Sequence, residues 1–527
     1  MAELSDRPFP PGTYPVIVVG SGPGGLQISY CLGRRGVPHA VLSADEAPGG
    51  MFRRWPFFQR LLSWTKPFAP VPRTDPAYER YDWNSLLADE PEHRALMPTL
   101  MDGSSYFPSR PEMEANLASF AERTGIVARY GCRWTATRRE ESAEGSTFVL
   151  ETTDGEYRTG ILVLAVGVAE PHVPATPGIE LAAHYADTRS VETYADRRVF
   201  IVGKQNSGFE LASGLLPWAR RIILASPSPA KLSVNTRSLV GVRARYLQPF
   251  EDHVLAGGVA VLDAAIGSIA RLPGGTLEVR VRPTEGGDEI AFEVDEVIAA
   301  TGFVTPLVDL PALGLTTVGQ SRIPVQTPYW ESASMPRVFF AGTITQGAPG
   351  LRKHGLPPNS GAVHGARYNA RVLARHIAGL VAASSGETPT GPGPEAAAVI
   401  PAEEIVDRLA VTLATSPELW HQRAYLARVF AIDASAGARD SGTVPLAAFL
   451  DGTGDDGSGD AVALTLEADG TGALYPVVYT RRAGRIEEHA LEPDILLRYD
   501  TPGARRRLEE VVAGFRSPAA RKSASSG

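Results

Sequence analysis

The residues with the clearest chemical meaning in this 527-residue chain lie in two glycine-rich turns. The first, in PVIVVGSGPGGLQISY, places Gly20, Gly22 and Gly25 in a GxGxxG pattern. The second, in RVFIVGKQNSGFELA, has Gly203 and Gly208 in the same register. Glycines at these positions let the backbone approach a pyrophosphate, whose charge a helix N-terminus stabilises. Two such turns predict a protein that binds two dinucleotides, usually a flavin and a nicotinamide.

The hydrophobic pattern indicates the elements that must position these turns. Apolar runs at 16–19 and 199–202 precede them, and a helical pattern follows each. Strand, tight turn and helix in this order are typical of a Rossmann-like unit. We therefore predict an α/β fold with two Rossmann-like dinucleotide-binding domains, in which the NADP domain is inserted into the FAD domain, plus a small α+β C-terminal region.

Changes in composition give the predicted boundaries. Residues 382–398 (AASSGETPTGPGPEAAA) have the Pro, Gly and Ser content of a linker. The segment at roughly 48–112 is rich in aromatic residues, Pro and Arg, and either covers a ligand or packs against the sheet. The predicted parts are the FAD-binding domain at 12–175 and 306–381, the NAD(P)H-binding domain at 176–305, the linker, the C-terminal region at 399–515 and a disordered tail at 516–527.

Residues near the first turn are candidates for holding FAD. An acidic residue usually ends the second strand and binds the ribose hydroxyls, but here Ser43 stands at that place, with Asp45 just beyond. Gly50 offers another close backbone approach. The sequence at 109–112 has the capping-box pattern of a helix start. Arg110 either belongs only to that helix start or also faces the flavin.

The second turn differs from the first in ways that bear on the nicotinamide cofactor. Gln205 replaces the middle glycine, and Lys204 places a positive charge beside the predicted phosphates. The next strand ends without the carboxylate that would repel a 2′-phosphate, which favours NADPH over NADH. Lys231 and Arg237 could instead be surface charges. The candidate NADPH residues are Gly203, Lys204, Gln205, Asn206, Ser207, Gly208, Ser226, Lys231 and Arg237.

Two later segments complete the predicted nucleotide sites. EVDEVIAATGF is an apolar strand ending at Thr301 and Gly302, where glycine allows the chain to reverse between domains. MPRVFFAGTITQ is a strand that leads into a turn at Gly342. We expect Thr301, Gly302 and Gly342 to contact the cofactors.

A long helix is predicted to begin near Ser360 and Gly361 and to run to about 381. The positive end of such a helix can stabilise negative charge on a bound flavin. Lys353, His354 and Asn359 precede it and are candidate catalytic residues. The positions further along the helix are expected to make packing and surface contacts; they are His364, Arg367, Tyr368 and Arg371.

Composition excludes several classes of function. A formal net charge of −8 argues against nucleic-acid or anionic-membrane partners. No apolar run reaches 18 residues, and MAELSDRPFPPG does not have the pattern of a secretory signal, so a cytoplasmic location is expected. The two cysteines, Cys31 and Cys132, form no CxxC pair for dithiol chemistry. We expect a small-molecule substrate, no metal and, as a possibility, a homo-oligomer.

A family resemblance covers residues 14 to about 380, or about 70% of the chain. This part resembles flavin-containing and N-hydroxylating monooxygenases. The segments RLLSWTKP, YDWNSLL, SYFPSRPEM and SGAVHGARYNARVL resemble the FAD-dependent oxidoreductase-domain flavoproteins. The asparagine that lies over the flavin in the monooxygenases is replaced here around Trp64 and Lys66, which we therefore treat as catalytic candidates.

The resemblance implies FAD that is reduced by NAD(P)H and then reacts with O2, giving a C4a-(hydro)peroxyflavin that passes one oxygen atom to a substrate. We predict an FAD- and NADPH-dependent monooxygenase of a small molecule, with N-hydroxylation of an amine or amino acid in bacterial specialised metabolism as the first choice. The first alternative is an NAD(P)H-dependent flavin oxidase or reductase that passes electrons to a partner or quinone. The second is a redox-sensing or scaffold flavoprotein.

Overall fold

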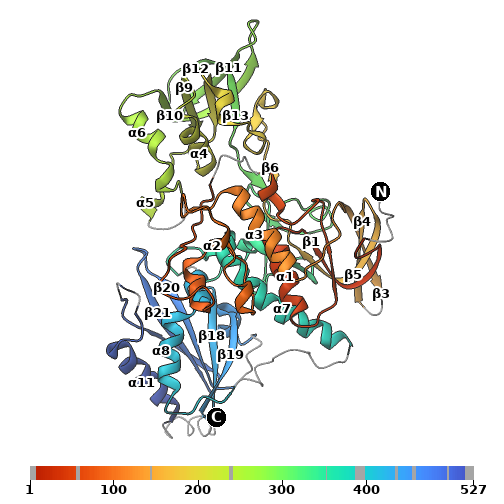
Figure 1. Cartoon of the computed structure of the whole chain (residues 1–527), viewed down its shortest axis with the longest axis vertical. Coiled ribbons are helices and arrows are strands. Elements are labelled where there is room, and N and C mark those ends of the chain that lie inside the picture. The colour runs from red at the N-terminus through yellow and green to blue at the C-terminus, as the bar shows by residue number, and fades with distance from the viewer. Residues whose placement is uncertain are drawn as a thin grey trace.

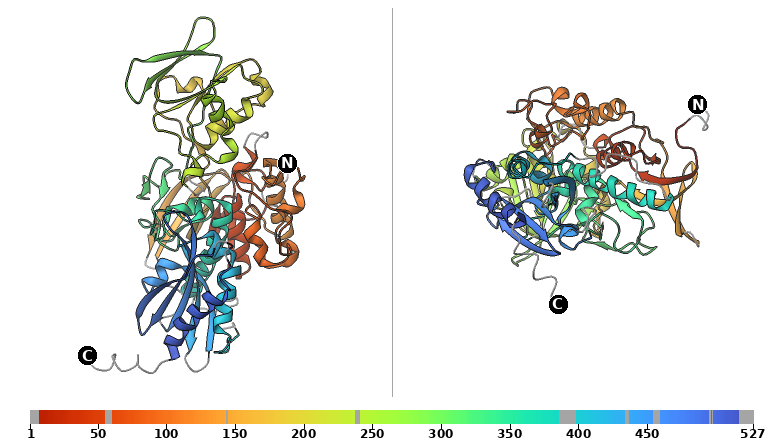
Figure 2. Two further views of the ribbon diagram at one scale, coloured as in Figure 1. Left: turned by 90° about the vertical axis from the view of Figure 1, so that its left-hand side faces the viewer. Right: turned by 90° about the horizontal axis from the view of Figure 1, so that it is seen from below.

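A computed structural model describes residues 7–54, 60–142, 145–236, 241–351, 353–385, 398–433, 437–453, 459–494, 496 and 498–516. Three sheets with their helices follow one another along the long axis of the molecule (Figures 1 and 2). The sheet that carries the second glycine turn lies at the top, that of the first turn in the middle, and the C-terminal sheet at the bottom. The predicted α/β fold is confirmed.

The middle sheet combines a parallel part with an antiparallel part. Its order is β2-β1-β5-β4-β3, and β17 pairs with β5 beyond the end of β4. The strands β2, β1, β5 and β17 run parallel. The consecutive residues Val16, Ile17 and Val18 are fully buried because helices or loops cover both faces of a parallel sheet. The strands are β1 (Gly12–Val19), β2 (His39–Leu42), β3 (Trp134–Ser142), β4 (Gly145–Thr152), β5 (Gly155–Leu164) and β17 (Val338–Phe340).

Four helices accompany this sheet: α1 (Pro23–Gly33), α2 (Met97–Leu100), α3 (Arg110–Arg123) and α7 (Val363–Ser385). α1 and α7 pack side by side. The predicted capping box starts α3, because the Ser109 side chain accepts from the Glu112 N–H while the Glu112 carboxylate accepts from the Ser109 N–H. α7 begins at Val363, three residues later than predicted, because residues 359–361 form a separate 3-10 turn.

The upper sheet has the order β12-β11-β10-β9-β8-β13-β7. β10, β9, β8, β13 and β7 are parallel, and β11 and β12 extend the sheet as antiparallel strands. The strands are β7 (Ala183–His184), β8 (Arg198–Val202), β9 (Arg221–Ser226), β10 (Val259–Arg271), β11 (Leu277–Pro283), β12 (Ile290–Val294) and β13 (Glu296–Ala299), and the helices are α4 (Asn206–Leu215), α5 (Ser233–Thr236) and α6 (Gln248–Val254).

The two chain crossings between the upper and middle units run side by side. β6 (Glu170–Pro171) and β14 (Phe303–Val304) form a short antiparallel pair. Next to it the Thr301 hydroxyl donates to the His172 carbonyl (2.6 Å), and Gly302 has a φ of +85°, which glycine adopts without strain. These residues connect the two units, in agreement with the predicted chain reversal. A further small pair is β15 (Thr317–Val318) with β16 (Ile323–Pro324).

The C-terminal sheet is antiparallel, with the order β19-β18-β20-β21-β22. Helices α8 and α11 cover one of its faces, where Leu409, Leu508 and Val512 pack against Val462 and Val478. The region also contacts α7, since Arg375 donates to the Ser441 and Thr443 carbonyls. The elements are α8 (Ile405–Thr415), α9 (Pro417–His421), β18 (Leu426–Asp433), β19 (Gly437–Pro445), α10 (Leu446–Leu450), β20 (Ala461–Ala468), β21 (Leu474–Arg482), β22 (Arg485–Ala490) and α11 (Pro502–Arg516).

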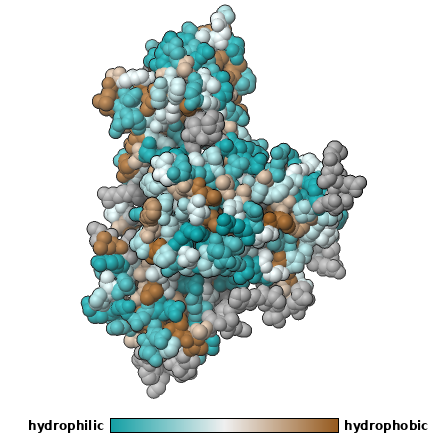
Figure 3. Space-filling view, viewed as in Figure 1, coloured by the Kyte–Doolittle hydropathy of each residue, from teal (hydrophilic) through white to brown (hydrophobic). Residues whose placement is uncertain are grey.

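The surface mixes polar and apolar residues. On the face drawn in Figure 3, brown apolar residues are scattered among polar ones. Within the described part of the chain, none of the helices has the length and apolar content needed to cross a membrane.

Candidate active site

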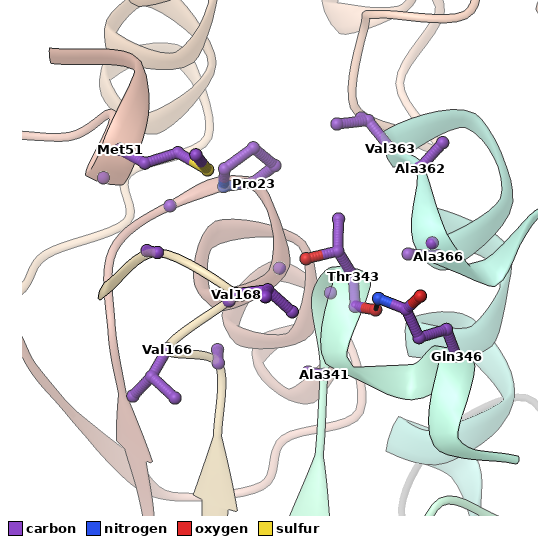
Figure 4. Close-up of a pocket in the computed structure, with 18 of the residues that line it drawn as sticks. Pro23, Met51, Val166, Val168, Ala341, Thr343, Gln346, Ala362, Val363 and Ala366 are labelled. Carbon is purple, nitrogen blue, oxygen red and sulfur yellow. Dashed lines mark hydrogen bonds between the residues drawn. The ribbon is translucent and has the colours of Figure 1, made fainter. Parts of the chain in front are cut away.

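A cavity of about 1010 Å³ opens at the carboxyl ends of the parallel strands of the middle sheet. Ligands of doubly wound sheets bind at this edge. Val19, Ala165 and Ala341, which end or follow β1, β5 and β17, line it. Figure 4 shows Pro23 and Met51 on one side of this space, and Ala362 with Val363 and Ala366 of α7 on the other. The C-terminal region also reaches the cavity, through Arg423, Ala424, Glu467 and Ala468.

The first glycine turn forms a cradle of closely packed backbone. A Cβ atom on Gly25 would lie 1.9 Å from the Gly20 carbonyl oxygen, and one on Gly24 would lie 2.5 Å from the Gly342 Cα. A Cβ on Gly50 would lie 3.0 Å from the Gly22 Cα. No side chain caps the N-terminus of α1, which begins at Pro23, so its first N–H groups can bind an anion. These features fit the pyrophosphate of FAD.

The residues beyond β2 also fit the adenosine end of FAD. Ser43 is buried, and its hydroxyl hydrogen-bonds with that of Ser21 (2.7 Å) and accepts from the Asp45 N–H (3.2 Å). Asp45 lines the cavity, where its carboxylate accepts from Arg54 (3.1 Å). Because the Ser43 hydroxyl already has two partners, Asp45 is the better candidate to bind a ribose.

The structure does not place Trp64 and Lys66 at the cavity. Leu61, Leu62 and Ser63 line it, but Thr65 turns inward to donate to Asp82 (2.8 Å), which leaves Lys66 exposed. The Trp64 ring packs against that of Trp83 (4.8 Å between centroids). Trp83 does line the cavity, so the tryptophan at the cavity wall is Trp83 rather than Trp64, whose ring packs behind it.

Arg110 likewise does not face the cavity. One guanidinium nitrogen, Nη1, donates to the Phe52 carbonyl (3.1 Å), the Arg53 carbonyl (3.2 Å) and Glu114 (3.0 Å). Arg110 therefore fixes the segment after Gly50 onto α3, and of the two interpretations left open by the sequence, its role at the helix start is the one that the contacts support.

Lys353, His354 and Asn359 all line the cavity. The Lys353 ammonium pairs with Glu467 (3.1 Å) and Glu488 (2.6 Å) and contacts the Tyr479 hydroxyl. The His354 ring lies 3.3 Å from the Tyr475 hydroxyl. These contacts join the loop before α7 to β20, β21 and β22, so Lys353 has a structural role in addition to its place at the cavity wall.

We predict that Lys353→Met destabilises the protein. Glu467 is 1% exposed, and without the lysine its charge keeps only the hydroxyls of Tyr479 (2.9 Å) and Tyr475 (3.1 Å). The apparent free energy of unfolding should fall by about 1–3 kcal/mol. Denaturant titrations compare the stability of Lys353→Met with that of Lys353→Arg, which keeps the positive charge. Equal stability of Lys353→Met and the wild-type protein would contradict the assigned role.

The start of α7 holds a buried polar group that the sequence did not single out. Gly361 lines the cavity, whereas Ser360 is buried behind it and accepts hydrogen bonds from Asn369 (3.0 Å) and Gln422 (2.9 Å). His364, expected to make packing contacts, lines the cavity, is 1% exposed, and has no hydrogen-bond partner at either ring nitrogen. A buried imidazole without partners at a cavity wall is suited to binding a ligand.

The second glycine turn repeats the packing of the first. A Cβ on Gly208 would lie 2.3 Å from the Gly203 carbonyl oxygen, and one on Gly203 would lie 2.4 Å from that of Ala300. Lys204, however, does not lie beside the expected phosphates. Its side chain is fully buried, donates to the Leu262 carbonyl (2.7 Å) and pairs with Asp263. This lysine connects the turn to β10, and the phosphate charge must be met by other groups.

The remaining candidates for the nicotinamide nucleotide lie near the same edge of the upper sheet. Gln205 is exposed at the N-cap of α4, and Ser207 is in its first turn. The Asn206 amide donates to the Gly241 carbonyl (2.9 Å) and accepts from the Arg243 N–H (3.0 Å). Ser226 ends β9, and Lys231 is exposed beyond it. Arg237 lies outside the described residues.

Glu210 on α4 gives the upper unit a pH dependence. It accepts hydrogen bonds from Tyr246 (2.9 Å) and Tyr185 (3.0 Å), and burial raises its pKa from 4.5 to about 7. The folded state therefore favours the protonated carboxyl group of Glu210. The stability that this group contributes is present below pH 4.5 and is lost as the pH rises through about 7.

We therefore predict that the free energy of unfolding of the wild-type protein falls relative to that of Glu210→Gln between pH 5 and pH 8, as glutamine cannot titrate. Denaturant titrations at both pH values measure the difference. A constant difference between the two proteins would contradict the raised pKa.

The comparisons with known proteins agree with this arrangement. Residues 104–342 match a family described as pyridine nucleotide-disulphide oxidoreductase. Together with the two glycine turns and the fold, the matches support the superfamily of two-dinucleotide-binding flavoproteins that includes flavin monooxygenases. The predicted superfamily is confirmed.

Three individual proteins illustrate the similarity. FAD-dependent oxidoreductase domain-containing protein 2 of Mus musculus is 27% identical over 386 residues, covering 68% of this chain but only 56% of that protein. Probable indole-3-pyruvate monooxygenase YUCCA4 of Arabidopsis thaliana is 25% identical over 351 residues (57% of this chain, 77% of that protein). The solved ornithine N-hydroxylase of Kutzneria sp. 744 shares the fold, with a TM-score of 0.50 at 14% identity (69% of this chain, 99% of that one).

Proposed function

We propose that this protein is an FAD-dependent, NADPH-using monooxygenase that acts on a small organic molecule. The observation that carries the proposal is the cavity, which extends from the phosphate-binding cradle at Gly20–Gly25 to the buried His364 and to Arg423 of the C-terminal region. It therefore offers space for a substrate beside a bound flavin. The similarity to indole-3-pyruvate monooxygenases supports the same reaction type.

The chain's residues would bind and enclose FAD rather than react covalently. The first turn and α1 would hold its pyrophosphate, Asp45 its ribose, and Trp83 would form an apolar wall that excludes water. Bound FAD would accept a hydride from NADPH and pass two electrons to O2, so that one oxygen atom enters the substrate and the other leaves as water.

The properties of the two cysteines favour oxygen chemistry over disulfide reduction. Cys31 and Cys132 are free and buried, and they are the only cysteines in the sequence. Burial raises the pKa of the Cys31 thiol to about 11, opposite to the shift that activates a redox cysteine. N-hydroxylation of an amine or amino acid, as part of bacterial specialised metabolism, is the specific reaction that we propose.

The experiment is NADPH-driven oxygen uptake by the purified FAD-loaded protein, with a panel of amines, amino acids, thioethers and ketones, and with products identified by mass. A product 16 mass units heavier than an amine or amino acid supports the proposal. NADPH oxidation that yields only hydrogen peroxide with every compound would favour an oxidase. The same panel with NADH tests the cofactor preference.

A further inference from the structure

Positive charge gathers at the end of the cavity that α7, the C-terminal region and the upper unit form together. His364, Arg367, Arg423 and Arg243 all line the cavity. Burial holds the pKa of His364 well below its usual range, and the charges of the three arginines lower it further. His364 is therefore neutral near pH 7, and the three guanidinium groups supply the charge.

Several of these groups lack a protein partner. Both ring nitrogens of His364 and the Nε of Arg367 have no hydrogen-bond partner, although these side chains are only 1% and 2% exposed. The other nitrogens of Arg367 donate to the Ser85 (2.6 Å) and Glu79 (2.8 Å) carbonyls. Across the described residues, the Arg423 guanidinium takes part in no ion pair or hydrogen bond, and it is half-buried at the cavity wall, where a ligand can reach it. Buried donors without partners are costly unless a ligand satisfies them.

The nearby carboxylates do not fully compensate this charge. Glu467 lines the cavity but pairs with Lys353 and accepts from two tyrosines. Glu79 accepts from the neutral Tyr368 hydroxyl (2.8 Å) and keeps its charge, so it can offset only one of the three guanidinium groups. The cluster therefore has cationic donors in excess, and its complement is an anion. It combines residues of α7 and the C-terminal region with Arg243 of the upper unit, whereas the cradle for the FAD pyrophosphate is built by the first glycine turn and α1.

We propose that this cluster binds the carboxylate group of the substrate, with Arg423 as its main contact. The inference rests on the proposed function and narrows it from amines in general to carboxylate-bearing molecules such as amino acids or keto acids. A planar guanidinium can donate two parallel hydrogen bonds to a carboxylate. Arg423 lies between α9 and β18, outside the residues that match the family, so the C-terminal region would determine substrate specificity.

Equilibrium binding to the FAD-loaded protein tests the proposal without turnover. The probes are benzoate, phenylpyruvate and lysine, each compared with its primary amide, which lacks the carboxylate charge, and the readout is the change in flavin absorbance and fluorescence. The wild-type protein should bind the acids at least about tenfold more tightly than the amides. Arg423→Gln should lose that preference while its binding of the amides stays unchanged, and Arg423→Lys should keep part of it. The matched control is Arg485→Gln, at an exposed site on β22, which should behave as wild type.

The proposal is overturned if the wild-type protein shows no preference for the acids, or if Arg423→Gln weakens acids and amides equally. It is also overturned if Arg423→Gln weakens NADP+ binding while the preference for acids persists, because the anion would then be a phosphate of the nicotinamide cofactor. Failure of the proposed function is distinguishable, since acids could bind selectively to a protein that oxygenates none of them.

Discussion

Gly25→Ala is expected to abolish stable FAD binding. The added Cβ would lie 1.9 Å from the Gly20 carbonyl oxygen and 2.7 Å from its carbon, and both are backbone atoms that cannot rotate away. The turn would have to open, which displaces the N-terminus of α1 from the site of the pyrophosphate. We expect a loss of at least ~2–4 kcal/mol in stability and of at least about tenfold in FAD affinity. The ratio of flavin to protein absorbance after purification measures the effect.

The same helix offers a matched control. Gly33 ends α1, is exposed, and a Cβ there would meet no atom within 4 Å. Gly33→Ala should therefore keep FAD and be neutral or more stable by up to ~1 kcal/mol, because alanine favours the helix. If Gly25→Ala retained FAD as well as Gly33→Ala does, the first turn would not be the flavin cradle.

Gly208→Ala is expected to separate the two nucleotide sites. Its Cβ would lie 2.3 Å from the Gly203 carbonyl oxygen, so the second turn should distort while the middle sheet remains intact. The variant should purify with FAD bound, yet anaerobic reduction of the flavin by NADPH should slow by at least about tenfold. Stopped-flow absorbance of the flavin measures this rate.

The control for this variant is Gly274→Ala, in the turn between β10 and β11, where a Cβ would meet no atom within 4 Å. The flavin of this control variant should be reduced by NADPH at the wild-type rate. Loss of FAD from Gly208→Ala, or unchanged reduction by NADPH, would contradict the assignment of the second turn to the nicotinamide nucleotide.

The sequence predicted the parts of this protein that depend on backbone geometry. Gly25 and Gly208 are needed because any Cβ would strike a carbonyl, and such constraints leave a spacing that can be recognised in the sequence. The capping box at Ser109 was predictable for the same reason, since it depends on neighbours in the chain.

Side-chain roles that depend on distant partners were not predictable. Lys204 follows a phosphate-binding glycine, but its ammonium pairs with Asp263, 59 positions away. Lys353 is held by residues of the C-terminal sheet. His364 has the spacing of a packing residue on α7, and only the structure shows that it lines the same cavity as Arg423 and Arg243. No local motif marks these contacts, because they form only when separate units pack together.

The most direct test of the central claim is the fate of molecular oxygen. With the FAD-loaded protein, NADPH, ¹⁸O₂ and a carboxylate-bearing amine substrate, the account predicts a product that carries one labelled oxygen atom for each NADPH consumed. NADPH oxidation in which the label appears only in hydrogen peroxide or water, and never in an organic product, would contradict it.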